Sequence, residues 1–491
     1  MNDQIRRLAV FGVALVASLI VATTYWQTWA AAGLADRQDN AIQRVAEFHI
    51  ERGEIRAGDV VLATNQERQV DGNTLYFRRY PQGGPFAHVV GYSTQVRSRA
   101  GLERSLNDYL TGANANLNTV VETALDRLRG GTIQGNDVQL TIVPRAQRIA
   151  REALGNRCGA VVALEPRTGR VLVLASSPSY DPNAIEGNFE GAQRAPNAEC
   201  RPANALYNRA TQGLYAPGST FKILTAAVGL ETGTIQANQT FQDPGFCLQY
   251  GQRVYNYADQ RGPAAYGTVN LTQAIQYSIN SVFCTIGQQL GADTLAEESK
   301  RFGFYSKPPL ETPPNERFAS GLYQDGDLFE PDDPGDADPG RFAFGQERLL
   351  VTPLQMAMLA AAIANGGMVM EPHLVAEVVS PGGRTVTKTQ PRELGRAVSQ
   401  QTASVVTQGM VAAVSAGTST AAQLPGIQVA GKTGTAETGQ SGVNTTSFIA
   451  FAPANDPQVA ISVFLESQRG TAGQTAAPIA RTVLQALLSG S

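Results

Sequence analysis

A serine and a lysine, three positions apart, lie where the chain passes from a Pro-Gly turn into an apolar segment with helical character. Pro217 and Gly218 precede Ser219 and Lys222 in the stretch YAPGSTFKILTAAVGL, and the spacing places both side chains on one helical face. A serine hydroxyl is a poor nucleophile without an adjacent base. Lysine, with an ordinary pKa of about 10.4, becomes that base only where burial or a nearby cation stabilises its neutral form. The pattern indicates a Ser–Lys nucleophile and base, although a serine that merely caps a helix has the same signature.

Two further motifs carry the other groups that acyl transfer by such a pair requires. Ser278-Ile279-Asn280 follows Ser219 by 59 residues, and Lys432-Thr433-Gly434-Thr435 follows Ser278 by 154 residues. Together they offer a hydroxyl to relay a proton, an amide to hold a substrate and a fixed positive charge. The three motifs in this order, S-x-x-K, S-x-N and K-T-G, are typical of penicillin-binding proteins and β-lactamases. We therefore expect the three segments to meet around Ser219.

Two other catalytic patterns fail on their context. Gly426–Thr433 fits the nucleotide-binding pattern G-x-x-x-x-G-K-T, but its β-branched residues favour a strand. The residues that follow, GTAETGQSG, are too rich in Gly, Thr and Ser to begin the helix that would hold phosphates. A Ser-His-Asp hydrolase is excluded because no G-x-S-x-G occurs and only His49, His88 and His373 are available.

The overall composition excludes further classes of function. The chain has 491 residues, with 39 Lys+Arg against 42 Asp+Glu and a formal net charge of −3. This near balance argues against a nucleic-acid surface, which needs a strong basic excess. Three His and four Cys are too few and too scattered for a His-rich metal enzyme or a zinc-finger array. At about 150 residues per domain, the length predicts two or three domains.

An apolar segment near the N-terminus predicts a membrane anchor. Leu8–Ala35 contains no charged residue and is long enough to span the hydrocarbon core of a bilayer. Arg6 and Arg7 precede it, which favours an N-terminus on the cytoplasmic side. The alternative is a cleaved signal peptide, because the small residues Ala30–Ala32 follow the apolar run. Both interpretations place the rest of the chain outside the cytoplasm.

A location outside the cytoplasm would allow the cysteines to form disulfides. Cys158, Cys200, Cys247 and Cys284 would be able to pair in an oxidising compartment, and four cysteines allow three connectivities. The alternative is that all four are small buried apolar residues. The spacing does not choose between these possibilities, and it fits neither a CxxC redox pair nor a zinc site.

Hydrophobic periodicity predicts strands at both ends of the catalytic region and helices between them. Gly159–Ser177 has the pattern of a β-hairpin, and IQVAGKTGTAE, TTSFIAFAP and DPQVAISVFLES near the C-terminus have strand character. We expect helices over 220–230, 271–290 and 353–364, and a closing helix in AAPIARTVLQALLSG. This order predicts an α/β domain whose sheet collects strands from both ends of its sequence.

The chain resembles a class B penicillin-binding protein, and is most similar to the penicillin-binding protein A group. The similarity extends beyond the three motifs to RGEIRAGDVVLA, the Gly101–Glu103 triplet, DVQLTIVPRAQRIA, and VTPLQMAMLAAAIANGG. It implies an antiparallel sheet flanked by helices with an all-helical subdomain, preceded by one transmembrane helix and a small mixed α+β module. The expected divisions are a cytoplasmic tail (1–7), an anchor (8–29), a non-catalytic membrane-proximal pedestal (30–140) and a transpeptidase domain (141–491).

The resemblance also implies a role for each residue of the first two motifs. Ser219 would attack the carbonyl of the D-Ala–D-Ala bond of a peptidoglycan stem peptide, and Lys222 would remove its proton. Ser278 would pass a proton to the leaving D-Ala amine, and Asn280 would hold a substrate amide. An amine from a neighbouring stem would then attack the acyl-enzyme and complete the cross-link.

The third motif would bind and polarise the substrate. Lys432 would favour the neutral form of Lys222 and attract the anionic substrate. Thr433, Gly434 and Thr435 would form the strand that binds the substrate, with both threonine hydroxyls on its terminal carboxylate. The backbone N–H groups of Ser219 and Thr435 would form the oxyanion hole. The resemblance implies no metal or organic cofactor, and β-lactams would acylate Ser219 because they mimic the donor amide.

Two departures from the family pattern bear on substrate preference. Gly345-Gln346-Glu347 stands where many relatives have Gly-Gln-Gly, and Ser447-Phe448 stands where many have Trp-Phe. The alternatives are a secreted serine β-lactamase and a non-catalytic β-lactam sensor or scaffold. A secreted β-lactamase would need neither the anchor nor the pedestal. The resemblance further implies a single-pass enzyme of the cytoplasmic membrane, beside a membrane glycosyltransferase and proteins of cell division or elongation.

Overall fold

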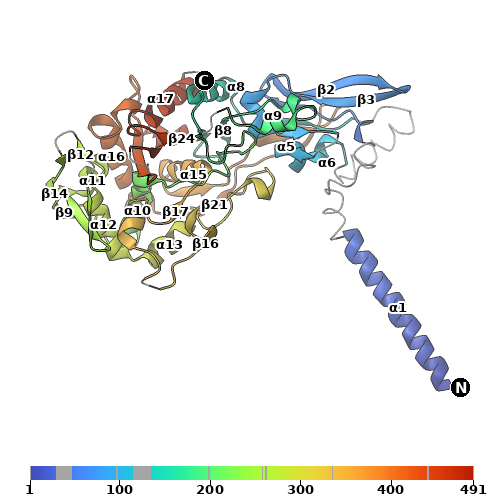
Figure 1. Ribbon diagram of the computed structural model, residues 1–491, viewed down its shortest axis with the longest axis horizontal. Coiled ribbons are helices and arrows are strands. Elements are labelled where there is room, and N and C mark those ends of the chain that lie inside the picture. The colour runs from blue at the N-terminus through green and yellow to red at the C-terminus, as the bar shows by residue number, and fades with distance from the viewer. Residues whose placement is uncertain are drawn as a thin grey trace.

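A computed structural model describes residues 2–28, 47–95, 98–113, 134–196, 199–256, 258–259, 262–333, 335–439 and 442–489. Its first helix, α1 (Asn2–Thr28), extends away from the folded body (Figure 1). Arg6–Trp26 within α1 is apolar enough and long enough to cross a membrane, and none of it is buried. Within the described residues α1 is the only such helix, in agreement with the expected single anchor.

The central element is a five-stranded antiparallel sheet of order β22-β23-β24-β7-β8. Its strands are β7 (Gly159–Leu164), β8 (Val171–Ser177), β22 (Ala430–Glu437), β23 (Asn444–Ala452) and β24 (Val459–Gln468). The expected hairpin over 159–177 and the strand character of the C-terminal third are confirmed. The nucleotide-loop pattern ends in β22, a strand, as its β-branched residues predict.

Helices cover both faces of this sheet. One face is packed by α8 (Pro144–Leu154) and α17 (Ala476–Leu488), and the other by α15 (Pro353–Ala364) and α16 (Gln400–Ala416). The strands are apolar on both faces because both are buried: Val162 of β7 packs into one core cluster and Val161 into the other. The predicted helices over 353–364 and at the C-terminus are confirmed.

A helical region lies beside the sheet, at the opposite end of Figure 1 from the hairpin formed by β2 (Val60–Val70) and β3 (Asn73–Arg79). It contains the 3-10 turn η3 (Gly218–Thr220), α10 (Lys222–Glu231), α11 (Leu271–Gln276), α12 (Asn280–Leu290), α13 (Ala292–Lys300) and α14 (Pro339–Ala343). It also contains short strand pairs that the sequence did not predict, namely β9 (Thr240–Asp243) with β14 (Gly267–Asn270) and β10 (Phe246–Gln249) with β11 (Gln252–Tyr255). The predicted single helix over 271–290 is wrong, because α11 ends before Ser278 and α12 begins after it.

A second sheet has the order β20-β19-β6-β1-β2-β3. Its strands are β1 (Ile55–Ala57), β2 (Val60–Val70), β3 (Asn73–Arg79), β6 (Asp137–Leu140), β19 (Val375–Val379) and β20 (Thr385–Lys388). Strand β19 pairs with β6, so a segment more than two hundred positions further along the chain joins this sheet. Together with α1 and the central sheet, this mixed sheet agrees with the predicted fold class.

The remaining elements are short. The helices are α4 (Ala87–Val90), α5 (Gly101–Ser105), α6 (Asn107–Leu110) and α9 (Phe189–Gln193). The strands are β4 (Tyr92–Ser93), β5 (Arg99–Ala100), β12 (Ala258–Asp259), β13 (Gly262–Pro263), β15 (Gly321–Gln324), β16 (Asp327–Phe329), β17 (Leu349–Leu350), β18 (Met368–Met370) and β21 (Glu393–Arg396).

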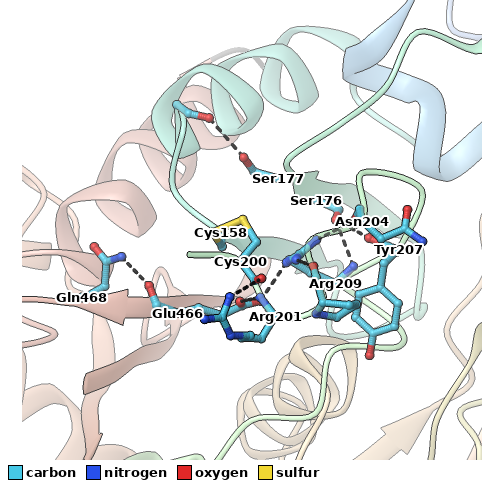
Figure 2. The surroundings of a disulfide bond; sticks show 12 residues. Cys158, Ser176, Ser177, Cys200, Arg201, Asn204, Tyr207, Arg209, Glu466 and Gln468 are labelled. Atoms are coloured by element: carbon cyan, nitrogen blue, oxygen red, sulfur yellow. Dashed lines mark hydrogen bonds and ion pairs between the residues drawn. A yellow bond between two sulfur atoms is a disulfide. The ribbon is translucent and has the colours of Figure 1, made fainter. Parts of the chain in front are cut away.

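A disulfide joins Cys158 to Cys200, whereas Cys247 and Cys284 are free and buried. Figure 2 shows that Glu466 and Arg209 lie beside it. The Glu466 carboxylate accepts hydrogen bonds from Arg209 Nε at 2.7 Å and from the Tyr215 hydroxyl at 2.8 Å. The segment that leads into η3 is therefore held to the sheet by the disulfide and by this buried ion pair.

Removal of this disulfide is expected to lower the free energy of unfolding by roughly 4 kcal/mol, because the bridge closes a long loop in the unfolded chain. Its cysteines are 42 positions apart. Urea unfolding of a Cys158→Ser/Cys200→Ser variant measures the loss, with Cys247→Ser as the control for changing a buried cysteine that is not bridged. A loss below about 1 kcal/mol would contradict the pairing.

Candidate active site

The nucleophile candidate Ser219 lies in η3, at the entrance to α10. Gly218 has a φ of +56°, and its backbone N–H donates to the Gly345 carbonyl at 2.9 Å. The Thr220 hydroxyl donates to the Pro217 carbonyl at 2.9 Å. These bonds fix the turn on both sides of Ser219. The Ser219 side chain is half-buried, and within the described part of the chain its hydroxyl has no hydrogen-bond partner.

Lys222, the first residue of α10, is completely buried and reaches the second motif. Its Nζ lies 2.7 Å from the Ser278 carbonyl oxygen, 3.3 Å from Ser278 Oγ and 2.7 Å from Asn280 Oδ1. Burial, together with the positive charge of Lys432, holds the pKa of Lys222 well below its usual value. Both effects favour the neutral amine that a general base requires.

Ser278 lies in the break between α11 and α12, with a φ of +60°. On one side, α11 begins with a capping box formed by Asn270 and Gln273. On the other side, α12 begins after Ile279, whose side chain has no capping group. The left-handed conformation costs about 1–2 kcal/mol for a residue other than glycine. It interrupts the helix that periodicity predicts, and directs both the carbonyl and the hydroxyl of Ser278 toward Lys222.

Lys432 of β22 lies on the other side of Ser278. Its Nζ is buried and donates to Ser278 Oγ at 2.8 Å and to the Thr433 carbonyl at 2.9 Å. Burial lowers the pKa of Lys432 to about 7. The Ser278 hydroxyl therefore bridges two lysines with lowered pKa values, and this arrangement is able to relay a proton.

The third motif is packed directly against the turn that carries Ser219. A Cβ added to Gly434 would lie 2.4 Å from the Pro217 carbonyl oxygen, and one added to Gly218 would lie 3.1 Å from Thr435 N. Only glycine permits this approach on each side. Strand β22 thus places the Thr435 backbone beside η3, as an oxyanion hole shared between the two segments requires.

The two threonines of the third motif differ in their contacts. Thr433 is buried, and its hydroxyl donates to Thr418 Oγ1 at 3.0 Å. Thr435 is half-buried, and its hydroxyl accepts from the Ala472 N–H at 3.4 Å. Among the described residues no group of three or more His, Cys, Asp or Glu side chains is placed to hold a metal ion.

The two departures from the family pattern both contact this region. Gly345 receives the hydrogen bond from Gly218, and Glu347 occupies the left-handed region with a φ of +65°. Ser447 of β23 is buried, and its hydroxyl donates to the Pro217 carbonyl at 2.8 Å. Ser447 therefore joins the sheet to the nucleophile turn, a role that the sequence did not indicate.

A Ser447→Ala variant is expected to lose about 1 kcal/mol of stability, the usual net contribution of one hydrogen bond. The Pro217 carbonyl keeps its bond from Thr220, so no buried acceptor is left unsatisfied. Urea unfolding measures this loss. A stability unchanged from that of the wild type would show that the Ser447 bond does not hold the turn.

Two family models match separate parts of the chain. The model described as "Penicillin binding protein transpeptidase domain" matches residues 159–485. The chain belongs to the penicillin-binding protein transpeptidase family. A second model, described as "Penicillin binding protein A dimerisation domain", matches residues 52–138. The predicted family, fold class and enzyme class are therefore confirmed.

Relatives match this penicillin-binding protein along its whole length. It is 36% identical over 511 aligned positions, covering 100% of both chains, to "Peptidoglycan D,D-transpeptidase PbpA" of Mycolicibacterium smegmatis. The imipenem acyl-enzyme complex of penicillin-binding protein A from M. tuberculosis aligns with a TM-score of 0.78 and 34% identity, over 90% of this chain and 99% of that one. The penicillin G acyl-enzyme complex of the same protein gives 0.77 and 35%, over 89% and 99%. These matches support the transpeptidase over the β-lactamase and sensor alternatives.

Proposed function

We propose that Ser219 is the nucleophile of a peptidoglycan D,D-transpeptidase and that Lys222 is its general base. Ser219 Oγ attacks the carbonyl of the D-Ala–D-Ala bond, while Lys222 takes the hydroxyl proton. The backbone N–H groups of Ser219 and Thr435 stabilise the oxyanion of the tetrahedral intermediate. Ser278, between the two lysines, passes a proton to the leaving D-Ala amine. Attack on the acyl-enzyme by an amine of a neighbouring stem peptide then forms the cross-link.

The remaining motif residues bind the donor peptide. Asn280 holds a backbone amide of the stem, and Lys432 with Thr433 and Thr435 binds its terminal carboxylate. Gly434 allows β22 to approach η3 closely enough for this. The observation that carries the proposal is the contact of Lys222 and Lys432 with one serine hydroxyl, Ser278 Oγ, at 3.3 and 2.8 Å. It joins three motifs that are distant in sequence.

We further propose that α1 anchors the chain with its N-terminus in the cytoplasm and the catalytic domain outside. Arg6 and Arg7 precede the apolar span, which agrees with the positive-inside rule. The Cys158–Cys200 disulfide is consistent with an oxidising compartment beyond the membrane. Residues 1–7 form the tail, 8–29 the anchor, 30–140 the pedestal and 141–491 the transpeptidase domain.

The pedestal is also the proposed contact with other proteins of wall synthesis. By its family resemblance, the enzyme works beside a membrane glycosyltransferase of the division or elongation machinery. A pull-down of the full-length chain from solubilised membranes tests this. Recovery of a glycan polymerase supports the partner, and a pull-down that recovers none counts against it.

Peptide mapping of the acyl adduct tests the central proposal. Full-length enzyme is incubated with benzylpenicillin and digested, and we expect the penicilloyl mass on the peptide that contains Ser219. A chromogenic cephalosporin should give one stoichiometric burst, because a transpeptidase acyl-enzyme reacts slowly with water. An adduct on another serine would refute the assignment of the nucleophile, and rapid continuous turnover would indicate a β-lactamase.

A further inference from the structure

A buried carboxylate, that of Asp243, lies beside the N-terminus of α12, next to the second motif. Asp243 ends β9 and is 3% exposed. Within the described residues no lysine or arginine nitrogen forms an ion pair with it, so hydrogen bonds must stabilise its charge. Four groups provide them: Gly245 N at 2.8 Å, Tyr266 N at 2.8 Å, Asn256 Nδ2 at 2.9 Å and Ser281 Oγ at 2.5 Å.

Two of these donors connect Asp243 to the first turn of α12. Ser281 is the residue after Asn280, and its hydroxyl donates to Asp243 Oδ1. Asn256, oriented by both oxygens of Asp243, accepts the Ser281 N–H through its Oδ1 at 3.1 Å. The first N–H groups of a helix need acceptors, and Ile279 at the N-cap has none to offer. Asp243 and Asn256 therefore replace the missing cap from outside the helix.

The same network fixes the side chain of Asn280. Asn280 Nδ2 donates to the Tyr255 carbonyl at 2.8 Å, and Tyr255 precedes Asn256 in the chain. This bond leaves Asn280 Oδ1 facing Lys222 Nζ at 2.7 Å. The orientation of the amide, and with it the environment of Lys222, thus depends on the strand segment that Asp243 holds through Asn256.

We infer that Asp243 is a positioning residue for acylation: it holds the N-terminus of α12 so that Ser278 and Asn280 face Lys222. Ser278 occupies a left-handed conformation that needs support from both sides. On the side of α11, the backbone N–H groups of Ser278 and Ile279 donate to the Ile275 and Ala274 carbonyls at 3.2 and 3.0 Å. On the side of α12, the Asp243 network provides the support. Asp243 touches no reacting atom and acts only through Asn256 and Ser281. The inference rests on the proposed function, in which these motifs bind and activate the donor.

Saturation kinetics of acylation by benzylpenicillin test this role in full-length enzyme. Asp243→Asn keeps the volume of the side chain but turns an N–H group toward one of the four donors. We expect the acylation rate constant k2 to fall about 100-fold, the effect of misplacing a catalytic group by about 1 Å, with less than a threefold change in pre-acylation binding. Ser281→Ala, which removes the hydroxyl that donates to Asp243, should also lower k2.

The matched control is Glu311→Gln, a half-buried carboxylate that also accepts backbone N–H groups, from Leu374 at 2.8 Å and Val375 at 3.1 Å. It lies outside the three motifs, so its k2 should equal that of the wild type even if its melting temperature falls. A k2 within twofold of the wild type in Asp243→Asn would overturn the inference. If that variant does not fold, Ser281→Ala decides by the same criterion.

The two proposals fail in distinguishable ways. A penicilloyl adduct that maps to a serine other than Ser219 in the wild type refutes the proposed function. A wild-type adduct on Ser219, together with an unchanged k2 in the Asp243 and Ser281 variants, refutes only the positioning role.

Discussion

A Ser219→Ala variant is expected to lose all covalent labelling by a fluorescent penicillin while keeping its fold. The acyl bond forms to Ser219 Oγ, and no neighbouring side chain occupies the same place: Thr220 points its hydroxyl back to the Pro217 carbonyl. The side chain of Ser219 is half-buried and, among the described residues, makes no hydrogen bond, so its removal costs little stability. In-gel fluorescence measures the labelling and thermal unfolding measures the fold.

The matched control is Ser462→Ala, which removes a buried hydroxyl that donates to the Pro353 carbonyl. This change should leave labelling intact although it removes a hydrogen bond. Labelling of Ser219→Ala at more than about 1% of the wild-type rate would contradict the assignment, because a missing nucleophile costs far more than a hundredfold.

The pH dependence of acylation is expected to be bell-shaped, with opposite requirements for the two lysines. Lys222 must be neutral to accept a proton, so the rate rises with pH as Lys222 deprotonates. Burial and the Lys432 charge lower the pKa of Lys222, which places this rise well below pH 10.5. Lys432 must be charged to attract the anionic donor. Burial lowers the pKa of Lys432 to about 7. Above that pH Lys432 loses its charge, and we expect the rate to fall by about tenfold per pH unit.

Substitution of Lys432 separates the two limbs. In Lys432→Arg the charge persists at every accessible pH, because arginine stays protonated, and the alkaline limb should disappear. In Lys432→Ala the loss of a neighbouring positive charge raises the pKa of Lys222, and the acidic limb should move to higher pH. Second-order acylation rates, determined from about pH 5 to about pH 10, measure both shifts. An alkaline limb that survives in Lys432→Arg would show that another group carries it.

Local patterns in the sequence were sufficient for the strands of the central sheet and for several of its helices. The hairpin over 159–177 and the helix over 353–364 form as expected because their apolar residues follow the period of the structure that buries them. The three motifs were recognisable in combination, because each is common by itself but their order along the chain is typical of one chemistry. The helix expected over 271–290 failed, because periodicity carries no sign of the left-handed backbone at Ser278.

What the sequence could not predict depends on contacts between distant segments. Pairing of β19 with β6 joins residues more than two hundred positions apart. No local pattern in either strand indicates which strand it pairs with. No sequence pattern indicated a role for Asp243, which resembles an ordinary turn residue in the stretch FQDPGF. Its hydrogen bond with Ser281 forms only because α12 packs against it.

The sequence by itself predicted the chemistry of this protein: a Ser–Lys pair, a relay serine with an amide, a cationic side chain, and one apolar segment as a membrane anchor. The choice of Cys158–Cys200 among three pairings, the break at Ser278 and the cap that Asp243 and Asn256 provide were decided only by tertiary structure. The physical reason is that residue type and spacing act over a few positions, whereas burial, disulfide geometry and hydrogen-bond satisfaction are settled when the whole chain packs.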